Sequence, residues 1–222
     1  MSKRITAVLG DFYHDRDLAV KSFQGGIERL KQETNIELDV TYLSVSELIN
    51  NIKTNPDVIV LFAENRLNPE DTDVKRWMTA EDAKIINDYV KNGGSWLAWH
   101  AGLASYENIE EYTSMLKGYF LHHPDKHQVV TYTTDFSSEY FSPDEKFKFL
   151  DEHYFVQVEE DQTNIFLKSE SVDGSSLAGW YHGYGKGKVL CLTPAHIEEG
   201  LMNPTFLKVF AKSIKWCCEV GI

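Results

Sequence analysis

The sequence predicts an α/β protein whose sheet is mostly parallel in the first half and gains antiparallel strands in the second half. Up to residue 99, short apolar runs alternate with longer segments of helical periodicity, a succession that folds into right-handed βαβ units. Beyond residue 127, short runs rich in threonine, valine and aromatic residues follow one another with turn residues between them, as in antiparallel sheets. The length of 222 residues, 42% of them hydrophobic, and the lack of a linker-like stretch predict a single domain over residues 1–222.

The elements of the first half follow from periodicity and from helix-end signals. The predicted strands are residues 5–9, 36–43, 57–62 and 95–99. The predicted helices are residues 17–33, residues 44–52 behind a Ser44–Glu47 capping box, and a third helix that begins at Thr79 and ends before Gly93 and Gly94. Residues 57–62 are continuously apolar, as expected for a strand that is covered on both faces.

The elements of the second half are shorter. The predicted antiparallel strands are residues 128–133, 153–158, 165–168 and 177–180. Residues 185–187 form a turn into a further strand, residues 188–193, which we expect to return to the main sheet. Residues 203–219 close the chain as a helix.

Composition narrows the class of partner and the compartment. A formal net charge of -12 disfavours nucleic acids and anionic membranes as partners. The apolar run at residues 5–9 is too short for a secretory signal. Three cysteines, two of them adjacent, do not make a disulfide framework, so we expect a reducing cytoplasm and a buried, inert Cys191.

Three histidines follow predicted strands. His14 lies in the loop after the first strand, His100 follows residues 95–99, and His196 follows residues 188–193. Ligands of open α/β sheets bind beyond the carboxyl ends of the strands, so we expect these histidines to converge on one site. The predicted carboxyl ends are residues 10–15, 63–66 and 100–104. The first of them has no glycine-rich phosphate pattern, which disfavours a dinucleotide or P-loop site.

His100 is the sharpest candidate for a functional residue. The small residues Ala101 and Gly102 follow it and permit a tight strand-to-helix turn, which lifts a side chain into the crevice as a nucleophile elbow does. A histidine at this place suits general acid–base catalysis or metal ligation rather than acyl transfer. The alternative is a structural histidine that hydrogen-bonds the turn.

Residues 151–154 (DEHY) hold a second group of candidates. Glu152 and Tyr154 share one face if this segment is extended, and a glutamate near a histidine can form an acid–base pair or a pair of metal ligands. The alternative is a solvated charge run. Of the neighbouring His122 and His123, at most one can face a site, because successive side chains of an extended segment point to opposite sides.

Residues 180–185 (WYHGYG) hold the third group. Trp180 could stack on a sugar ring, with His182 beside it; the alternative is a hairpin turn with core aromatic residues. His123 and His127 have the His-x-x-x-His spacing of helical zinc sites, but Pro124 argues against a helix through them. A metal site would therefore be assembled from distant loops. The candidate metal ligands are His14, His100, His182 and His196.

Six short motifs occur in order along nearly the whole chain. They are His14-Asp15, residues 93–101 (GGSWLAWHA), 116–120 (LKGYF), 151–154 (DEHY), 180–189 (WYHGYGKGKV) and 195–196 (AH). This series resembles the trehalose-utilisation, ThuA-like family within the class I glutamine amidotransferase-like fold. Lys117 stands where the family usually has a glycine.

The resemblance implies a flavodoxin-like three-layer sandwich and a role in carbohydrate use. It maps six site positions onto this chain: His14, His100, Glu152, Tyr154, His182 and His196. It also implies that the amidotransferase cysteine is absent, because His100 stands about where that cysteine would be, and that glutamine hydrolysis is therefore not the activity.

Two main functions remain open. The first is an enzyme, an isomerase, lyase or hydrolase, that acts on a sugar or keto-sugar with His100 and Glu152 as acid–base residues. His14, His182 and His196 would polarise the substrate or hold a divalent metal such as zinc or manganese, and Tyr154 and Trp180 would shape the pocket. The second is a binding module for a sugar or sugar-derived effector; a subunit with a vestigial site is a third interpretation. A small-molecule sugar is the expected partner, and a homo-oligomer stays open.

Overall fold

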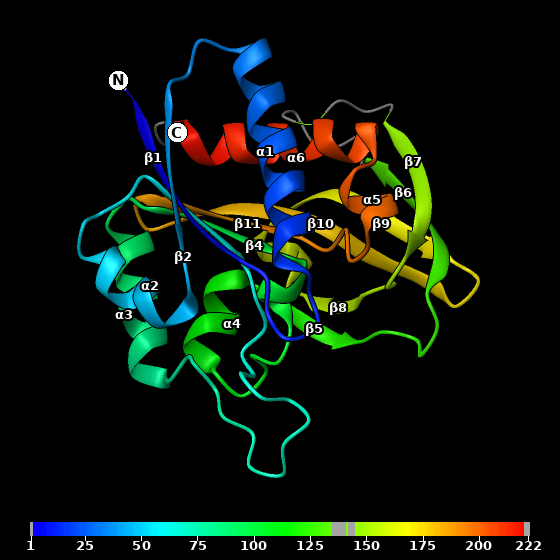
Figure 1. Ribbon diagram of the computed structural model, residues 1–222, viewed down its shortest axis with the longest axis horizontal. Coiled ribbons are helices and arrows are strands. Elements are labelled where there is room, and N and C mark those ends of the chain that lie inside the picture. Colours follow the sequence, from blue (N-terminus) through cyan, green and yellow to red (C-terminus); the bar gives the residue numbers. More distant parts are fainter. Residues whose placement is uncertain (1, 135–140, 142–144, 220–222) are drawn as a thin grey trace.

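In the computed structural model, which describes residues 2–134, 141 and 145–219, a nine-stranded sheet lies between two layers of helices (Figure 1). In order across the sheet, the strands are β2 (Leu38–Leu43), β1 (Lys3–Leu9), β3 (Val58–Phe62), β4 (Ser95–Trp99), β11 (Gly187–Leu192), β10 (Gly174–Tyr184), β9 (Asn164–Ser171), β6 (Gln128–Thr134) and β7 (Lys146–Asp151). The pairs from β2 to β11 are parallel, and those from β11 to β7 are antiparallel. The predicted division into a parallel and an antiparallel half is confirmed.

Each face of the sheet has its own hydrophobic core. On one face lie α1 (Arg16–Glu33), α5 (Glu198–Leu201) and α6 (Pro204–Cys218), and on the other lie α2 (Val45–Ile52), α3 (Ala80–Lys91) and α4 (Glu110–Leu116) (Figure 1). The expected capping box is present at Ser44, a second capping box opens α3 at Thr79, and the Asn203 side chain accepts hydrogen bonds at the start of α6. Within the described chain, no helix has the length and apolar character that crossing a membrane requires.

The segment predicted as a strand over residues 153–158 differs from the expectation. Only Phe155–Val158 form a strand, β8, which pairs antiparallel with β5 (Gly118–His122) in a separate two-stranded sheet instead of lying beside the core strands. Neither β5 nor β7 was predicted. In β7, buried Phe147, Phe149 and Asp151 alternate with exposed residues, and the strand ends where the chain leaves the sheet toward Glu152.

Strand β10 is longer than residues 177–180 because it continues through Trp180 to Tyr184. The turn follows directly after Tyr184, at the predicted position, and begins at Gly185, whose φ of +61° lies in the left-handed region. The chain then returns as β11 beside β4, as expected. Lys117, which stands at the family's glycine position, also has a left-handed φ, +58°.

Candidate functional site

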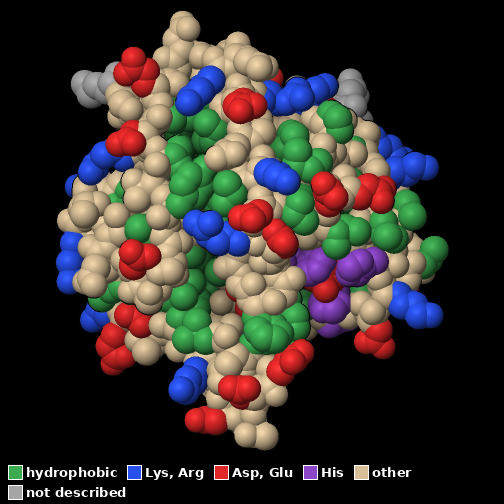
Figure 2. All heavy atoms as spheres, in the orientation of Figure 1, with side chains coloured by type: hydrophobic (Ala, Val, Ile, Leu, Met, Phe, Trp, Pro, Cys, Tyr) green, Lys and Arg blue, Asp and Glu red, His purple; other side chains and the backbone are tan. Residues whose placement is uncertain are grey.

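Four neighbouring parallel strands end at the same edge of the sheet and carry polar residues there. His14 follows β1, Glu64 follows β3, His100 follows β4, and His196 follows β11. The structure brings the three histidines together: their ring centroids lie 4.7 to 5.4 Å apart. Figure 2 shows histidine side chains gathered around acidic side-chain atoms on the face of the molecule that it displays.

His100 is fully buried at the start of the short 3₁₀ helix η1 (His100–Leu103), with a left-handed φ of +44°. Its Nδ1 lies 2.6 Å from the carbonyl oxygen of Thr193. Because a carbonyl only accepts, Nδ1 carries the hydrogen and Nε2 presents a lone pair. The ring of Tyr154 stacks on His100 at a centroid distance of 4.1 Å, which fixes the imidazole plane.

His14 is oriented by Asp11 in the same loop. Asp11 Oδ1 lies 2.6 Å from His14 Nδ1, and Asp11 Oδ2 accepts a hydrogen bond from the backbone N–H of Glu64. Burial raises the pKa of Asp11, but the hydrogen bonds from His14, Glu64 and Tyr13 outweigh it and hold that pKa below its ordinary value. His14 Nε2 is buried and has no hydrogen-bond partner among the described residues, which is unusual for a buried imidazole.

Glu152 completes the cluster. Its Oε2 lies 3.5 Å from His100 Nε2 and 3.4 Å from His196 Nδ1, and the two imidazole nitrogens are 3.2 Å apart. The loop that carries His196 is held by Asp151, whose Oδ1 accepts the His196 backbone N–H and whose Oδ2 accepts the Tyr132 hydroxyl. Burial raises the pKa of Asp151 to about 7.

The protonation states of the cluster follow from burial and contact. Burial alone would raise the pKa of Glu152, but its interactions with His100, His196 and His123 hold it at about 2. Burial, helped by the neighbouring His100, lowers the pKa of His196 to about 3. Burial also lowers the pKa of His100, against the opposing effect of Glu152. At neutral pH these groups are therefore neutral imidazoles and an ionised carboxylate, the forms that bind metals.

The donor atoms fit a zinc-type metal site. One ligand atom from each of His14, His100, Glu152 and His196 lies within 4.8 Å of the others. Zinc–ligand bonds of about 2.0–2.1 Å in a tetrahedron place the ligand atoms about 3.3 Å apart. The separations among His100, His196 and Glu152 are 3.2, 3.4 and 3.5 Å. The Nδ1 partners of His14 and His100 match the outer-shell acceptors that metal-bound histidines have.

A cavity of about 390 Å³ opens onto this cluster, within the range of small-molecule sites. Its described lining includes His14, Glu152, Tyr154 and His196, together with Tyr13, Glu64, Arg66, Ala104, Ser105, Phe120 and His123. His123 Nε2 lies 3.3 Å from Glu152 Oε1, whereas His122 stacks on Phe155 outside this cavity.

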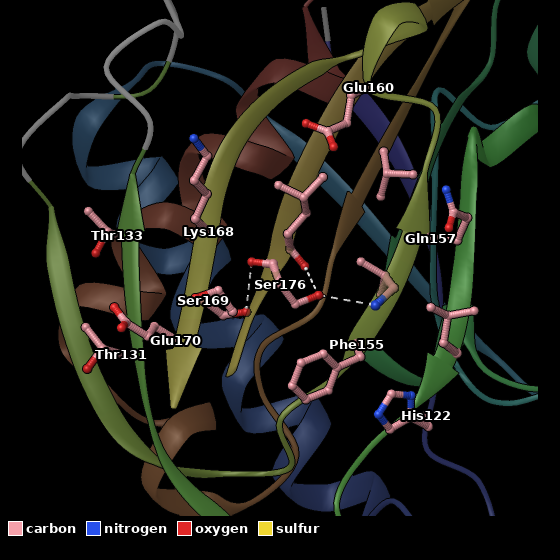
Figure 3. Close-up of a pocket in the computed structure, with 15 residues that line it drawn as sticks. His122, Thr131, Thr133, Phe155, Gln157, Glu160, Lys168, Ser169, Glu170 and Ser176 are labelled. Atoms are coloured by element: carbon pink, nitrogen blue, oxygen red, sulfur yellow. Dashed lines mark hydrogen bonds between the residues drawn. The ribbon is translucent and has the colours of Figure 1, made fainter. Parts of the chain in front are cut away.

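A larger cavity, about 640 Å³, lies between β8 and the open face of β6, β9 and β10 (Figure 3). Its labelled side chains include the hydroxyls of Thr131, Thr133 and Ser176. Ser176 Oγ accepts the Val156 N–H there. None of the residues expected at the site line this larger cavity. Because the convergent imidazoles and the shifted pKa values belong to the smaller cavity, we take the smaller one as the candidate site.

Trp180 and His182 were expected at the site, but the structure does not bring them to the cluster. Trp180 is fully buried in the core under α4 and donates Nε1–H to the Leu116 carbonyl. His182 contacts Met115 and Thr163. Because β10 is antiparallel to β11, residues after Gly179 run away from the carboxyl edge. Of the four candidate metal ligands, His182 is therefore set apart from the other three.

Two residues around the site, Asp11 and Glu64, were not among the sequence-based candidates. Asp151 lay within the second group of candidates, and of the pair His122 and His123 it is His123 that faces the site. The sequence placed residues 10–15 and 63–66 at strand ends, but it did not indicate which side chains turn inward. Asp11 lies three residues before His14, the spacing of a local side-chain-to-backbone turn. That spacing was the one available signal for Asp11.

An open sheet with a parallel core between two helical layers, and with polar residues gathered at the carboxyl edge of that core, defines a flavodoxin-like α/β protein. A family model described as trehalose utilisation, ThuA, matches residues 7–217, and the chain belongs to this family.

Similar solved structures agree with this fold. A ThuA-like protein from Parabacteroides merdae has a TM-score of 0.74 at 12% identity, covering 98% of this chain and 90% of that one. A ThuA-like protein from Bacteroides uniformis has a TM-score of 0.67 at 15% identity, covering 97% and 91%. A protein from Salmonella typhimurium named as cytoplasmic has a TM-score of 0.61 at 15% identity, covering 97% and 98%. No curated protein matches the chain.

Proposed function

We propose that this protein is an enzyme that acts on a sugar or keto-sugar by metal-assisted chemistry, with His14, His100, Glu152 and His196 as metal ligands. One observation carries the proposal: four donor atoms converge within 4.8 Å at the strand ends, three of them at separations expected for a tetrahedral zinc site. In this proposal His100 and Glu152 act as ligands rather than as the acid–base pair that the sequence suggested.

The chain's own residues would prepare the site in three ways. Asp11 and the Thr193 carbonyl hold the Nε2 atoms of His14 and His100 toward the cluster. Glu152 supplies the one carboxylate among the four proposed ligands, and its low pKa keeps it ionised. Tyr154 closes one side of the cluster against water. A bound divalent metal polarises a carbonyl oxygen or acidifies a bound water.

The sugar part of the proposal is supported by the family and by the pocket. The family model is described as trehalose utilisation, and the aromatic side chains of Tyr13, Phe120 and Tyr154 line the cavity as apolar surfaces for a sugar ring. We also propose a cytoplasmic location, supported by the name of the Salmonella protein, and a small-molecule partner rather than nucleic acid, supported by the net charge of -12.

Elemental analysis and turnover measurements test this function on the full chain. We expect about one zinc or manganese ion per chain after purification without chelators. We also expect NMR to detect conversion of a keto-sugar such as 3-keto-trehalose, which stops when the metal is removed and resumes when it is restored. A metal-free protein that also binds none on titration would refute the metal site. A metal-loaded protein that binds keto-sugars without converting them would make the chain a binding module.

Asp11→Asn is expected to weaken zinc binding by about 10- to 100-fold, as loss of outer-shell partners does. The variant removes the carboxylate that accepts from His14 Nδ1 and leaves the four ligands in place. Isothermal titration with zinc measures the change, and Asp39→Asn, at an exposed position of β2, is the matched control. Equal affinities for the two variants would show that Asp11 does not orient a ligand.

A further inference from the structure

Glu64 is a buried carboxylate in the same cavity that the metal cluster does not use. It follows β3, which lies between the strands that lead to His14 and His100. Its side chain lines the cavity and is nearly fully buried. The four-residue ligand cluster does not include it, so its burial at this edge needs a separate explanation.

The two carboxylate oxygens of Glu64 have very different surroundings. Oε2 accepts hydrogen bonds from Arg66 Nε at 2.8 Å and from the Ser105 hydroxyl at 2.8 Å, and Arg66 Nη2 lies 2.7 Å from it. Oε1 is buried and has no hydrogen-bond partner among the described residues. An unpaired buried acceptor is destabilising, and at a ligand cavity it calls for a donor from the ligand.

The charges of the cavity define which donor fits. Among its described lining residues, Arg66 is the one lysine or arginine, and both of its contacts with Glu64 end on the same oxygen. A phosphate or carboxylate group of a ligand placed beside Glu64 would need a free guanidinium or ammonium there and would meet the Glu64 carboxylate instead. A neutral hydroxyl donates to a carboxylate without that repulsion.

We propose that Glu64 is a specificity-determining residue whose Oε1 accepts a hydrogen bond from a hydroxyl of a neutral sugar, and that its pairing with Arg66 excludes phosphorylated or acidic sugars. The proposal rests on the proposed sugar function of the cavity. It adds that the sugar is neutral, not phosphorylated or acidic. Arg66 and Ser105 are positioning residues here, because they hold Glu64 Oε2 and leave Oε1 for the ligand.

Calorimetric titration of the full, zinc-supplemented chain with two matched pairs tests the proposal: trehalose against trehalose 6-phosphate, and glucose against glucose 6-phosphate. We expect at least one neutral sugar to bind about tenfold or more tightly than its phosphorylated partner. In Glu64→Ala we expect its binding to weaken by about tenfold or more, the effect of losing one hydrogen bond to a charged group. The preference for the neutral over the phosphorylated sugar should also narrow or reverse, because Arg66 loses its partner Glu64 and its guanidinium becomes free to bind a phosphate.

Several controls keep the result specific. Glu64→Gln has nearly the same shape and still removes the charge, so it replaces the alanine variant if that one fails to fold. Glu107→Gln, at an exposed position, should behave as the wild type. Zinc content should stay unchanged in all variants, and this separate readout shows whether the metal proposal fails instead. The proposal is overturned if the wild type prefers phosphorylated sugars, if no neutral sugar binds, or if the Glu64 variants keep the wild-type preference.

Discussion

Glu152→Gln is expected to reduce zinc affinity by more than about a hundredfold. Loss of an outer-shell partner weakens metal binding by about 10- to 100-fold, and loss of a direct ligand should cost more. The substitution keeps the size of the side chain and removes the one negative charge among three imidazoles. Glu152 Oε2 lies within 3.5 Å of both His100 and His196, so the change acts at the centre of the cluster. A neutral amide does not replace a carboxylate ligand of zinc, and turnover of the keto-sugar should fall to background.

The measurement pairs zinc titration with thermal unfolding. A ligand present at 100 times its Kd stabilises the native state by about 2.7 kcal/mol, so zinc should raise the Tm of the wild type and leave that of Glu152→Gln nearly unchanged. Glu159→Gln is the matched control, because Glu159 is paired with Lys117 at the surface. His100→Ala should give the same loss of zinc response. If both variants keep wild-type zinc affinity, Glu152 and His100 do not bind the metal, and an acid–base role returns as the better account.

The sequence predicted the parallel half of the fold because β1, β3, β4 and β11 are mostly buried apolar runs and helical segments with clear start signals lie between the first strands, while β2 is more exposed. Residues 57–62 and 95–99 illustrate this, since their burial on both faces leaves little ambiguity. The same topology predicted that His14, His100 and His196 meet, because adjacent parallel strands share a carboxyl edge. That argument needs strand order and direction but no side-chain detail.

The remaining site residues depend on information that local patterns do not contain. Glu152 reaches the cluster from the end of β7, a strand at the far edge of the sheet, so no rule about neighbouring strand ends predicts its position. His182 shows the opposite case. It follows the end of the strand predicted at residues 177–180, but it lies inside the longer β10, whose antiparallel direction carries it away from the site. Glu64 is a candidate because its buried Oε1 has no hydrogen-bond partner among the described residues. That is a property of the packed structure and not of the local sequence.

The turn that presents His100 depends on Gly102. A Cβ at this position would lie 2.3 Å from the carbonyl oxygen of Leu61 and 3.2 Å from its carbonyl carbon. Both atoms belong to the backbone of β3, so no side-chain rotation relieves the overlap. The carbonyl of Gly102 also accepts the Tyr112 hydroxyl at 2.9 Å, which ties η1 to α4 and limits its movement.

Gly102→Ala is therefore expected to destabilise the protein by about 3 kcal/mol, the upper part of the range for overpacked positions, and to lower the Tm by roughly 6–12 °C. Gly183→Ala is the matched control, because a Cβ there meets nothing within 4 Å and the change should leave stability nearly the same. Because η1 begins at His100, the backbone shift that accommodates the added methyl group should also weaken zinc binding, whereas Gly183→Ala should not. Equal thermal stability of the two variants would show that β3 and η1 can move apart at little cost in free energy. The close approach of Gly102 to the Leu61 backbone would then not be what fixes His100 at the site.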